Sequence, residues 1–378
     1  MAKNAFSIAK ESLRKCYDKQ GIVAGRTHFN YYWARDSFYA SWGSLEIGDT
    51  DIVRQNLSTF LKNIDEKGQV PLRIGASNLY QWLALFGVKT RNDFRPEYSQ
   101  DKGRNPAIDP NLLFLITLGK YVEKTDDISI VKKNIEKIHK IIDWLEGFEK
   151  QGLIYAGNYS TWQDILKKKG FVLYTNVLYY QALVSASEFL KKADIKNEFL
   201  EKSNLVKQKI NEEFYDKKLG FYIDYFNEKM RSEIFSSDGN FFAIIFDVAD
   251  KKQADSILKK AEKIGISKDV PSYTNYPRYG FPEVYAPLYL AGMQDYNDYG
   301  VCWTWLGCLH SMALSNAGKK IEARKVLDNL SELIIKDKDV YETYEKNGKP
   351  LKRLFYSSEH PFAWSASFYI TAEKELKK

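Results

Sequence analysis

Two adjacent stretches of the chain decide the fold: VCWTWLGCLHSMAL at Val301–Leu314 and KKIEARKVLDNLSELIIK at Lys319–Lys336. Both carry apolar residues at helical spacing. The first stretch is apolar or aromatic nearly all round, so a helix formed by it must be surrounded by protein. The second has one apolar stripe and one charged face, which is typical of a helix that lies between a core and water. Together they predict an inner helix followed by an outer helix.

The same alternation runs along the whole chain. The twelve predicted helices cover residues 5–19, 35–48, 50–64, 110–122, 127–149, 174–193, 195–215, 238–249, 251–264, 299–316, 319–336 and 362–376. Six inner and six outer helices in alternation are the pattern of an all-α (α/α)6 barrel. Since no Pro/Gly/Ser-rich linker or charge shift divides the chain, we expect a single domain over residues 1–378. Strand signals are confined to one hairpin, 221–225 against 230–235.

The connections between these helices are of two lengths. Those that follow an inner helix are short, as at Gly48-Asp49 and Ala317-Gly318. Those that precede an inner helix are long and cover residues 20–34, 65–109, 150–173, 216–237, 265–298 and 337–361. In an alternating barrel all the long loops emerge on one face, at the N-termini of the inner helices. Because long ordered loops usually carry function, we expect the functional site on that face.

Aromatic and acidic residues concentrate in these long loops and just after them. Five of the eight Trp residues fall there: Trp33, Trp82, Trp162, Trp303 and Trp364. An indole face can stack on the C–H face of a sugar ring, although each Trp could equally fill the core. Asp109 and Asp238 could be helix N-caps or sugar ligands, since Asp is a favoured cap. Glu is a poor N-cap, so Glu342 and Glu359 are better functional candidates.

The composition restricts the class of protein. The 378 residues are 44% hydrophobic and carry a net charge of +7 spread along the chain, which predicts a globular protein with no nucleic-acid-binding arm. Three cysteines lack metal-ligand spacing, and we expect no metal or organic cofactor. The N-terminus has no signal-peptide pattern and no stretch is long enough to span a bilayer, so we expect a cytoplasmic protein without a membrane partner. The oligomeric state stays open.

Four segments, in order along the chain, resemble motifs of glucoamylases and their glucodextranase and trehalase-like relatives. Tyr31–Ser37 resembles the Y-x-W-x-R-D-S motif, in which Arg and Asp hold the terminal glucose. Residues 103–110 resemble the G-R-P…D-G-P-A segment. Ser160–Asp164 corresponds to the loop with the general acid. Tyr341–Tyr344, followed by Asn347–Pro350 and Ala363–Ser365, is similar to the A-E-Q-Y…G-x-P…T-W-S block, in which Glu is the general base.

The resemblance implies an exo-acting, inverting α-glucosidase that releases glucose from the non-reducing end of an α-glucan or oligosaccharide. Asp164 would be the general acid and Glu342 the general base, with Glu359 as the alternative base. Glucoamylases carry their acid at the position of Gln163. The T-W-x-D order seen here is similar to the amylo-α-1,6-glucosidase domain of glycogen-debranching enzymes. The substrate-binding residues would be Trp33, Arg35, Asp36, Arg104, Asp109, Trp162, Gln163, Trp303 and Trp364.

Other functions remain open on the sequence alone. A trehalase-type hydrolase would share the motifs, and the sequence does not choose among α-1,4, α-1,6 and α,α-1,1 bonds. A sugar epimerase or isomerase can use the same barrel and would depend on His28, His310 or His360. A non-catalytic glycan-binding barrel is the third alternative. A terpenoid cyclase is disfavoured because the chain has no D-x-D-D or D-D-x-x-D cluster.

Overall fold

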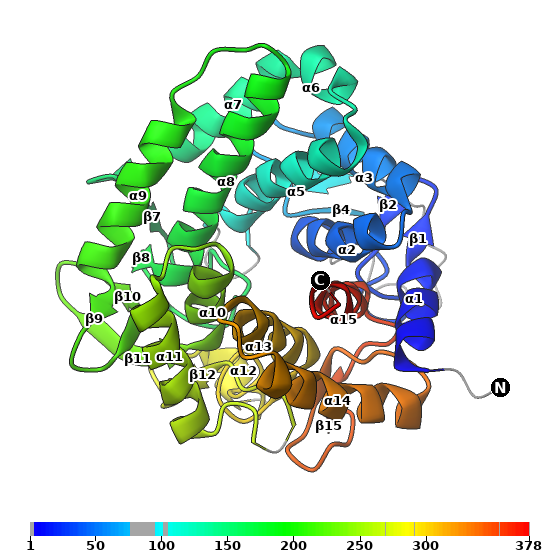
Figure 1. Ribbon diagram of the computed structural model, residues 1–378, viewed down its shortest axis with the longest axis vertical. Coiled ribbons are helices and arrows are strands. Elements are labelled where there is room, and N and C mark those ends of the chain that lie inside the picture. The colour runs from blue at the N-terminus through cyan, green and yellow to red at the C-terminus, as the bar shows by residue number, and fades with distance from the viewer. Residues whose placement is uncertain are drawn as a thin grey trace.

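The computed structural model describes residues 4–75, 95–100, 105–268, 270–290, 292–354 and 356–377. These residues form a mostly helical structure with fourteen helices. Six of them contact one another in a closed order around the centre, as Figure 1 shows: α2 (Ala34–Glu46), α5 (Asp109–Thr125), α8 (Leu173–Lys192), α10 (Ser237–Ile245), α13 (Thr304–Asn316) and α15 (Ala363–Glu375). Each contacts the next, and α15 contacts α2, which closes the ring.

Six further helices lie outside this ring (Figure 1): α1 (Ala5–Lys15), α3 (Thr50–Lys62), α7 (Ile135–Glu146), α9 (Phe199–Glu213), α11 (Lys251–Ile264) and α14 (Lys320–Asp337). The burial of the two kinds of helix differs as the sequence predicts. In α13 every residue from Thr304 to Leu314 is buried. In α14 the buried residues are Ala323, Leu327, Leu330 and Ile334, one stripe at helical spacing. Within the described ranges, no helix combines the length and apolar character needed to cross a lipid bilayer.

All twelve predicted helices occur, but several predicted spans are wrong in detail. The helices predicted at 5–19 and 238–249 end four residues early, at Lys15 and Ile245, and the one predicted at 195–215 begins four residues late, at Phe199. The span 127–149 is divided into α6 (Ser129–Lys133) and α7 at Asn134, whose Nδ2 donates to the carbonyl of Ile130 at 2.8 Å. This side chain competes with the helical backbone. The span 299–316 begins as a helix only at Thr304, because β13 (Cys302–Trp303) pairs with β14 (Thr343–Tyr344). The short helix α12 (Ala286–Leu290), within a long loop, has no sequence signal.

The predicted hairpin is confirmed, but the expectation of no other strands is wrong. β10 (Phe221–Phe226) and β11 (Arg231–Ser236) pair antiparallel and belong to a seven-stranded sheet in the order β12-β11-β10-β8-β7-β6, with β9 on β10. The remaining strands are β1 (Tyr17–Asp18), β2 (Gly21–Ile22), β3 (Tyr32–Trp33), β4 (Arg73–Gly75), β5 (Arg95–Glu97), β6 (Glu149–Lys150), β7 (Leu153–Ala156), β8 (Gly170–Val172), β9 (Tyr215–Asp216), β12 (Asn275–Tyr276), β15 (Lys352–Arg353) and β16 (Tyr356–Ser357). Most of these strands have only two or three residues, so the sequence cannot show the alternation of apolar and polar residues that predicts a strand.

Backbone hydrogen bonds tie five of the six long loops to a neighbouring inner helix. A backbone N–H at the start of an inner helix donates to a carbonyl of the next long loop in five cases: Ala34 to Leu72 (2.9 Å), Ile108 to Ser160 (3.2 Å), Ser237 to Thr274 (2.8 Å), Thr304 to Glu342 (3.1 Å) and Ala363 to Ala24 (2.9 Å). These bonds satisfy amide groups that a helix start leaves without an intrahelical partner. Through the helix starts, these bonds connect the loops into a rim, and the bond from Ala363 to Ala24 joins the start of the last inner helix to the first long loop.

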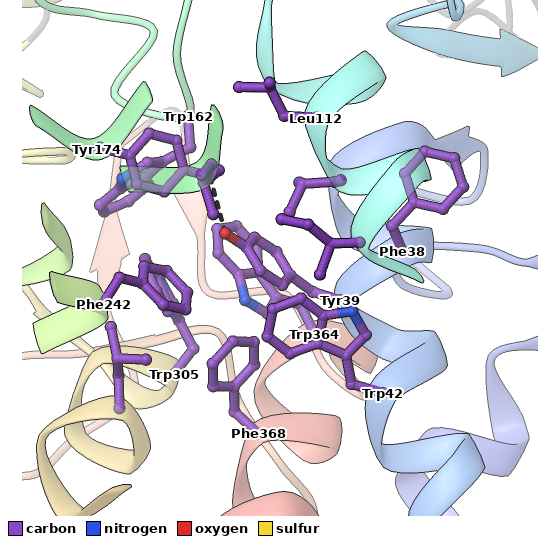
Figure 2. Close-up of a cluster of buried hydrophobic side chains, with 14 of the residues drawn as sticks. Phe38, Tyr39, Trp42, Leu112, Trp162, Tyr174, Phe242, Trp305, Trp364 and Phe368 are labelled. Carbon is purple, nitrogen blue, oxygen red and sulfur yellow. Dashed lines mark hydrogen bonds between the residues drawn. The ribbon is translucent and has the colours of Figure 1, made fainter. Parts of the chain in front are cut away.

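The centre of the ring is filled by aromatic side chains, drawn in Figure 2. Tyr39 stacks on Trp364 with ring centroids 4.9 Å apart, and Trp305 lies 4.5 Å from Trp364. The hydroxyl groups of Tyr39 and Tyr174 share a hydrogen bond of 2.9 Å, marked by the dashed line. The interior of the ring is thus a packed core beneath the long loops.

The contact between α2 and α15 depends on Gly43. A Cβ at this position would lie 2.6 Å from the Cα of Ser367, whose Oγ accepts a hydrogen bond from the Gly43 amide at 2.6 Å. We expect Gly43→Ala to lower the free energy of unfolding by about 1–3 kcal/mol, the usual cost of overpacking, despite the better helix propensity of Ala. Urea denaturation measures the difference. Gly280→Ala is the control, because no atom lies within 4 Å of its Cβ; equal losses would contradict the prediction.

Candidate active site

The N-termini of α2 and α5 meet in a buried ion pair. Arg35 and Asp36 lie in the first turn of α2, and Asp109 is the first residue of α5. Arg35 Nη1 and Asp109 Oδ2 are 3.0 Å apart, and both side chains are buried. The N-cap position of α5 is Ile108, and α5 has no side-chain cap. The capping alternative for Asp109 is therefore wrong, and its carboxylate serves Arg35 instead.

The charges of this cluster extend to the acid loop. Burial raises the pKa of Asp36 to about 7; the charge of Arg35 opposes this effect, while the carboxylates of Asp109 and Asp164 add to it. Asp164 also raises the pKa of Arg35 and that of Asp109. The fold thus brings Arg35, Asp36, Asp109 and Asp164 into one electrostatic group. Asp164 is only half-buried, whereas the other three side chains are buried.

The residues before Asp164 anchor the acid loop to α10. Trp162 Nε1 donates to Asp238, and Gln163 Nε2 donates to the same Asp238 oxygen at 3.2 Å. Asp238 lies inside the first turn of α10, whose N-cap position is Ser236, so its predicted capping alternative is also wrong. Gln163 is 1% exposed and also accepts a hydrogen bond from Lys168. The structure therefore places the Gln163 side chain in the support of the loop.

Sequence reasoning missed the charged pair beneath this loop. Lys168 is 3% exposed, and its Nζ lies 2.5 Å from Oδ2 of the fully buried Asp224. Tyr279 donates its hydroxyl hydrogen to the same oxygen at 2.5 Å. In sequence, Lys167–Lys169 reads as a solvated charge run. The structure exposes Lys167 and Lys169 and buries Lys168 between them. No sequence signal pairs Lys168 with a residue 56 positions later.

Glu342 is held by two tyrosines that sequence reasoning also missed. Tyr296 donates to Oε1 at 2.9 Å, and Tyr356 donates to Oε2. Glu342 is 3% exposed. Burial raises its pKa to about 8; the two phenol hydrogen bonds oppose the shift, and the charges of Asp36 and Glu359 add to it. The interaction with Asp36 connects Glu342 to the cluster at the start of α2.

Glu359 is placed differently. Its carboxylate accepts hydrogen bonds from the Thr27 amide (2.6 Å), the Thr27 hydroxyl (2.5 Å) and the His28 amide (2.7 Å), and the side chain is fully buried. Glu359 therefore fastens the loop before α2. Of the two candidate bases, Glu342 is the one bound by two side-chain hydroxyl groups, whereas two of the three hydrogen bonds to Glu359 come from backbone amides.

The predicted Trp residues differ in burial. Trp162, Trp303 and Trp364 are each no more than 3% exposed; the ring of Trp162 meets those of Trp303 and Trp364 edge-on, at 5.1 and 5.9 Å. Figure 2 shows Trp162 and Trp364 in the central aromatic cluster. Trp33 is half-buried, and the Arg73 guanidinium lies 4.8 Å from its ring centroid. Arg104 and Trp82 lie outside the described residues.

The histidines do not form a catalytic group. His310 stacks on Phe241, and its Nδ1 pairs with the Ser267 hydroxyl at 2.6 Å. His360 stacks on Tyr341 and its Nδ1 lies 3.3 Å from Asp339. His28 is exposed, and its ring centroid lies 6.4 Å from that of Tyr356, a partner of Glu342. These positions weigh against an epimerase or isomerase that works through inward-facing His.

The raised pKa of Glu342 makes the stability of the protein depend on pH. In the folded state this carboxyl group holds its proton up to about pH 8, whereas in the unfolded chain it titrates near 4.5. The folded state therefore binds more protons between these values, and its stability falls as the pH rises through them. We expect Glu342→Gln, which stays uncharged, to gain stability relative to the wild type by up to about 1.4 kcal/mol per pH unit across this window.

Urea denaturation of both proteins at about pH 5 and about pH 8.5 checks this prediction, because the two values lie near the two ends of this window. A stability difference that is the same at both pH values would show that Glu342 titrates alike in the folded and unfolded chain.

Comparisons with known proteins identify the family and the fold. The sequence model of the family described as amylo-alpha-1,6-glucosidase matches residues 6–366. No curated protein sequence matches the chain. Among solved structures, the chain is similar to a GH63 mannosylglycerate hydrolase from Thermus thermophilus in complex with Tris and D-glycerate, with a TM-score of 0.70, 13% identity, and 97% of this chain and 99% of that chain covered.

Two more solved structures share the fold. A glycosidase variant in complex with glucose has a TM-score of 0.69 and 14% identity, with 99% of this chain and 97% of that chain covered. A rhamnosidase from Klebsiella oxytoca with rhamnose bound has a TM-score of 0.70 and 12% identity; 98% of this chain is covered, and it spans 63% of the rhamnosidase chain. At these identities the likeness establishes the fold. Because the family model covers nearly its whole length, the chain belongs to the amylo-alpha-1,6-glucosidase family of glycoside hydrolases.

Proposed function

We propose that the protein is an exo-acting, inverting α-glucosidase of the debranching type, built as a single (α/α)6 barrel over residues 1–378. The observation that carries the proposal is electrostatic. The charge of Asp164 raises the pKa of Asp36, and the charge of Asp36 raises the pKa of Glu342. Two carboxyl groups from separate long loops thus act on one buried Arg-Asp group, and glycoside hydrolysis requires two carboxyl groups around the scissile bond.

Unpaired polar atoms at the starts of the inner helices suit a sugar ligand. The buried atoms of the described residues that have no hydrogen-bond partner include Arg35 Nε, Asp109 Oδ1, and the Nε1 atoms of Trp33, Trp305 and Trp364. An unsatisfied buried polar group costs about 1–3 kcal/mol. The nitrogen atoms in this set are donors, and the carboxylate oxygen is an acceptor. Sugar hydroxyl groups donate and accept, so a terminal glucose would satisfy both kinds.

The chemistry assigned to the two carboxyl groups follows from their surroundings. Asp164, half-buried in its loop, would protonate the glycosidic oxygen as the bond to the anomeric carbon breaks. Glu342 would remove a proton from the water that attacks this carbon from the opposite side. Tyr296 and Tyr356 each hold one oxygen of Glu342 and so fix its orientation. Because the pKa of Glu342 is about 8, its basic form gains as the pH rises toward that value.

The α-1,6 linkage is the bond we propose for cleavage. The T-W-x-D order places the carboxylate at Asp164, and Gln163 is committed to Asp238 and Lys168. This arrangement agrees with the description of the matching family. Hydrolysis of α-1,4-linked chains and of trehalose are the competing activities.

The stereochemical outcome tests the proposed activity directly. We expect proton NMR of the protein with isomaltotriose, panose, maltotriose and trehalose to show β-glucose as the first product, from the substrates with a non-reducing α-1,6 glucose. If α-glucose appeared first, the enzyme would retain the anomeric configuration, and the proposed inversion would be wrong. Binding without any release of glucose would select a non-catalytic glycan-binding barrel.

Replacement of each carboxyl group by its amide separates the roles of Asp164 and Glu342. With a natural glucoside, Asp164→Asn and Glu342→Gln should each lower kcat by about 10²–10⁴, the usual contribution of general acid-base catalysis. α-Glucosyl fluoride needs no protonation of its leaving group, so it should restore most of the rate of Asp164→Asn and little of that of Glu342→Gln. If α-glucosyl fluoride instead restored the rate of Glu342→Gln and not that of Asp164→Asn, Glu342 would be the acid and Asp164 the base.

Glu359→Gln is the matched control for the candidate base. Since Glu359 binds the Thr27 and His28 backbone, its replacement should lower thermal stability and leave more than about a tenth of kcat, because only support of the loop is lost. A complete loss of turnover in a folded Glu359→Gln protein would instead make Glu359 the base.

A further inference from the structure

A second long loop is fastened to the loop that carries Asp164. The Tyr285 amide donates to the carbonyl of Ile165 at 2.8 Å, and the Lys167 amide donates to the carbonyl of Glu283 at 2.9 Å. Val284, between these two residues of the second loop, is fully buried and forms a bridge with Leu166. The segment 283–285 therefore follows the backbone directly after the candidate acid and has a fixed position relative to it.

Apolar side chains on either side of this segment are exposed. Phe281 is 67% exposed, Tyr289 39% and Leu290 86%. The rings of Phe281 and Tyr289 lie 5.9 Å apart at 62°, so the two side chains form one surface. Of the residues of α12, which carries Tyr289 and Leu290 (Figure 1), none is buried. We name Phe281, Tyr289 and Leu290 the aromatic platform.

The setting of the platform differs from that of most other exposed apolar residues. Leu200 and Leu205 lie on α9, and Ile321 and Ile335 lie on α14, both outer helices. Met230 and Leu354 lie in other long loops, and Tyr276, in the same loop as the platform, contacts the ring of Tyr299 instead. Single apolar residues on such surfaces are common and need no explanation. The platform, in contrast, stands on a long loop that the acid loop holds by backbone hydrogen bonds. Exposed aromatic rings on a loop that is fastened to the segment directly after a candidate catalytic residue indicate a ligand surface.

The position of a general acid defines which part of the substrate lies beside it. The acid protonates the oxygen of the leaving group, so the sugar units that depart with this oxygen lie on the acid's side of the cleaved bond. The terminal glucose lies on the other side of that bond, toward Arg35 and Asp109 in the function proposed above. A surface attached to residues 165–167 is therefore on the side of the leaving group.

We propose that the aromatic platform binds the glucose units behind the scissile bond, and that the preferred substrate is a chain with several such units. This inference rests on the proposed function. Flat aromatic faces suit the C–H faces of sugar rings, as in the general affinity of Tyr and Phe for amphipathic surfaces. Between Tyr276 and Leu290 the charged residues are Arg278 and Glu283, of opposite sign, which suits a neutral glycan.

The test compares two substrates that share the cleaved bond and differ in the length of the leaving group. Isomaltose and maltopentaose carrying one α-1,6-linked glucose are such a pair. For the double variant Phe281→Ala/Tyr289→Ala we expect the ratio of kcat/KM for the long substrate to that for the short one to fall about tenfold, equal to about 1.4 kcal/mol of binding. The matched control is the double variant Leu205→Ala/Ile321→Ala, whose residues lie on two outer helices. We expect it to leave the ratio of the two kcat/KM values unchanged.

A binding measurement separates this inference from the proposed function. Titration calorimetry of Asp164→Asn with maltohexaose and with glucose is independent of turnover. We expect removal of the two platform rings to weaken maltohexaose binding about tenfold and to leave glucose binding unchanged. If the wild type cleaves neither substrate but this difference appears, the hydrolytic proposal fails and the platform stands. Equal losses for both ligands, no loss for either, or a change of oligomeric state in the platform variant would overturn the platform.

Discussion

The rest of the structure depends on one repeated interaction: the backbone N–H that starts an inner helix, bonded to a carbonyl of the neighbouring long loop. The bond from Ala363 to Ala24 joins the end of the chain to its beginning, and that from Thr304 to Glu342 fixes the backbone of the candidate base. Because loop carbonyls bond these amide groups, the carboxyl groups of Asp36 and Asp109 are not needed as their acceptors. Asp36 and Asp109 thus stay in the first turns of their helices, available to Arg35 and to a ligand.

The candidate site combines a rigid support with destabilised charges. Beneath the acid loop, Lys168 and Asp224 form a buried pair that Tyr279 completes. Loss of one partner from such a pair usually destabilises a protein strongly, because the other charge remains buried. Above it, burial raises the pKa of Asp36 to about 7 and that of Glu342 to about 8. Raised carboxyl pKa values are typical of sites where proton transfer takes place.

The position of Gln163 gives a structural reason for the departure from the glucoamylase pattern. The side-chain Nε2 of Gln163 donates a hydrogen bond to Asp238, and its Oε1 accepts one from Lys168. A carboxylate at this position could accept from Lys168 but would repel Asp238, so the acidic group belongs on the next residue, Asp164, which is less buried. The loop that follows Asp164 also holds the segment with the exposed Phe281 and Tyr289, so the acid and the proposed leaving-group surface share one framework.

The sequence by itself determined the twelve helices, their division into inner and outer kinds, and the order of the long loops, because helical periodicity and the width of an apolar face are local properties. It also predicted Arg35, Asp36, Asp109, Asp164 and Glu342 as site residues, because they lie in motifs or at helix starts, and the structure connects them electrostatically. Only the tertiary structure decided the partners: Tyr296 and Tyr356 on Glu342, Thr27 on Glu359, and Asp224 on Lys168. These contacts join residues from different loops. No local pattern encodes them, since they depend on where the closed ring of helices places each loop.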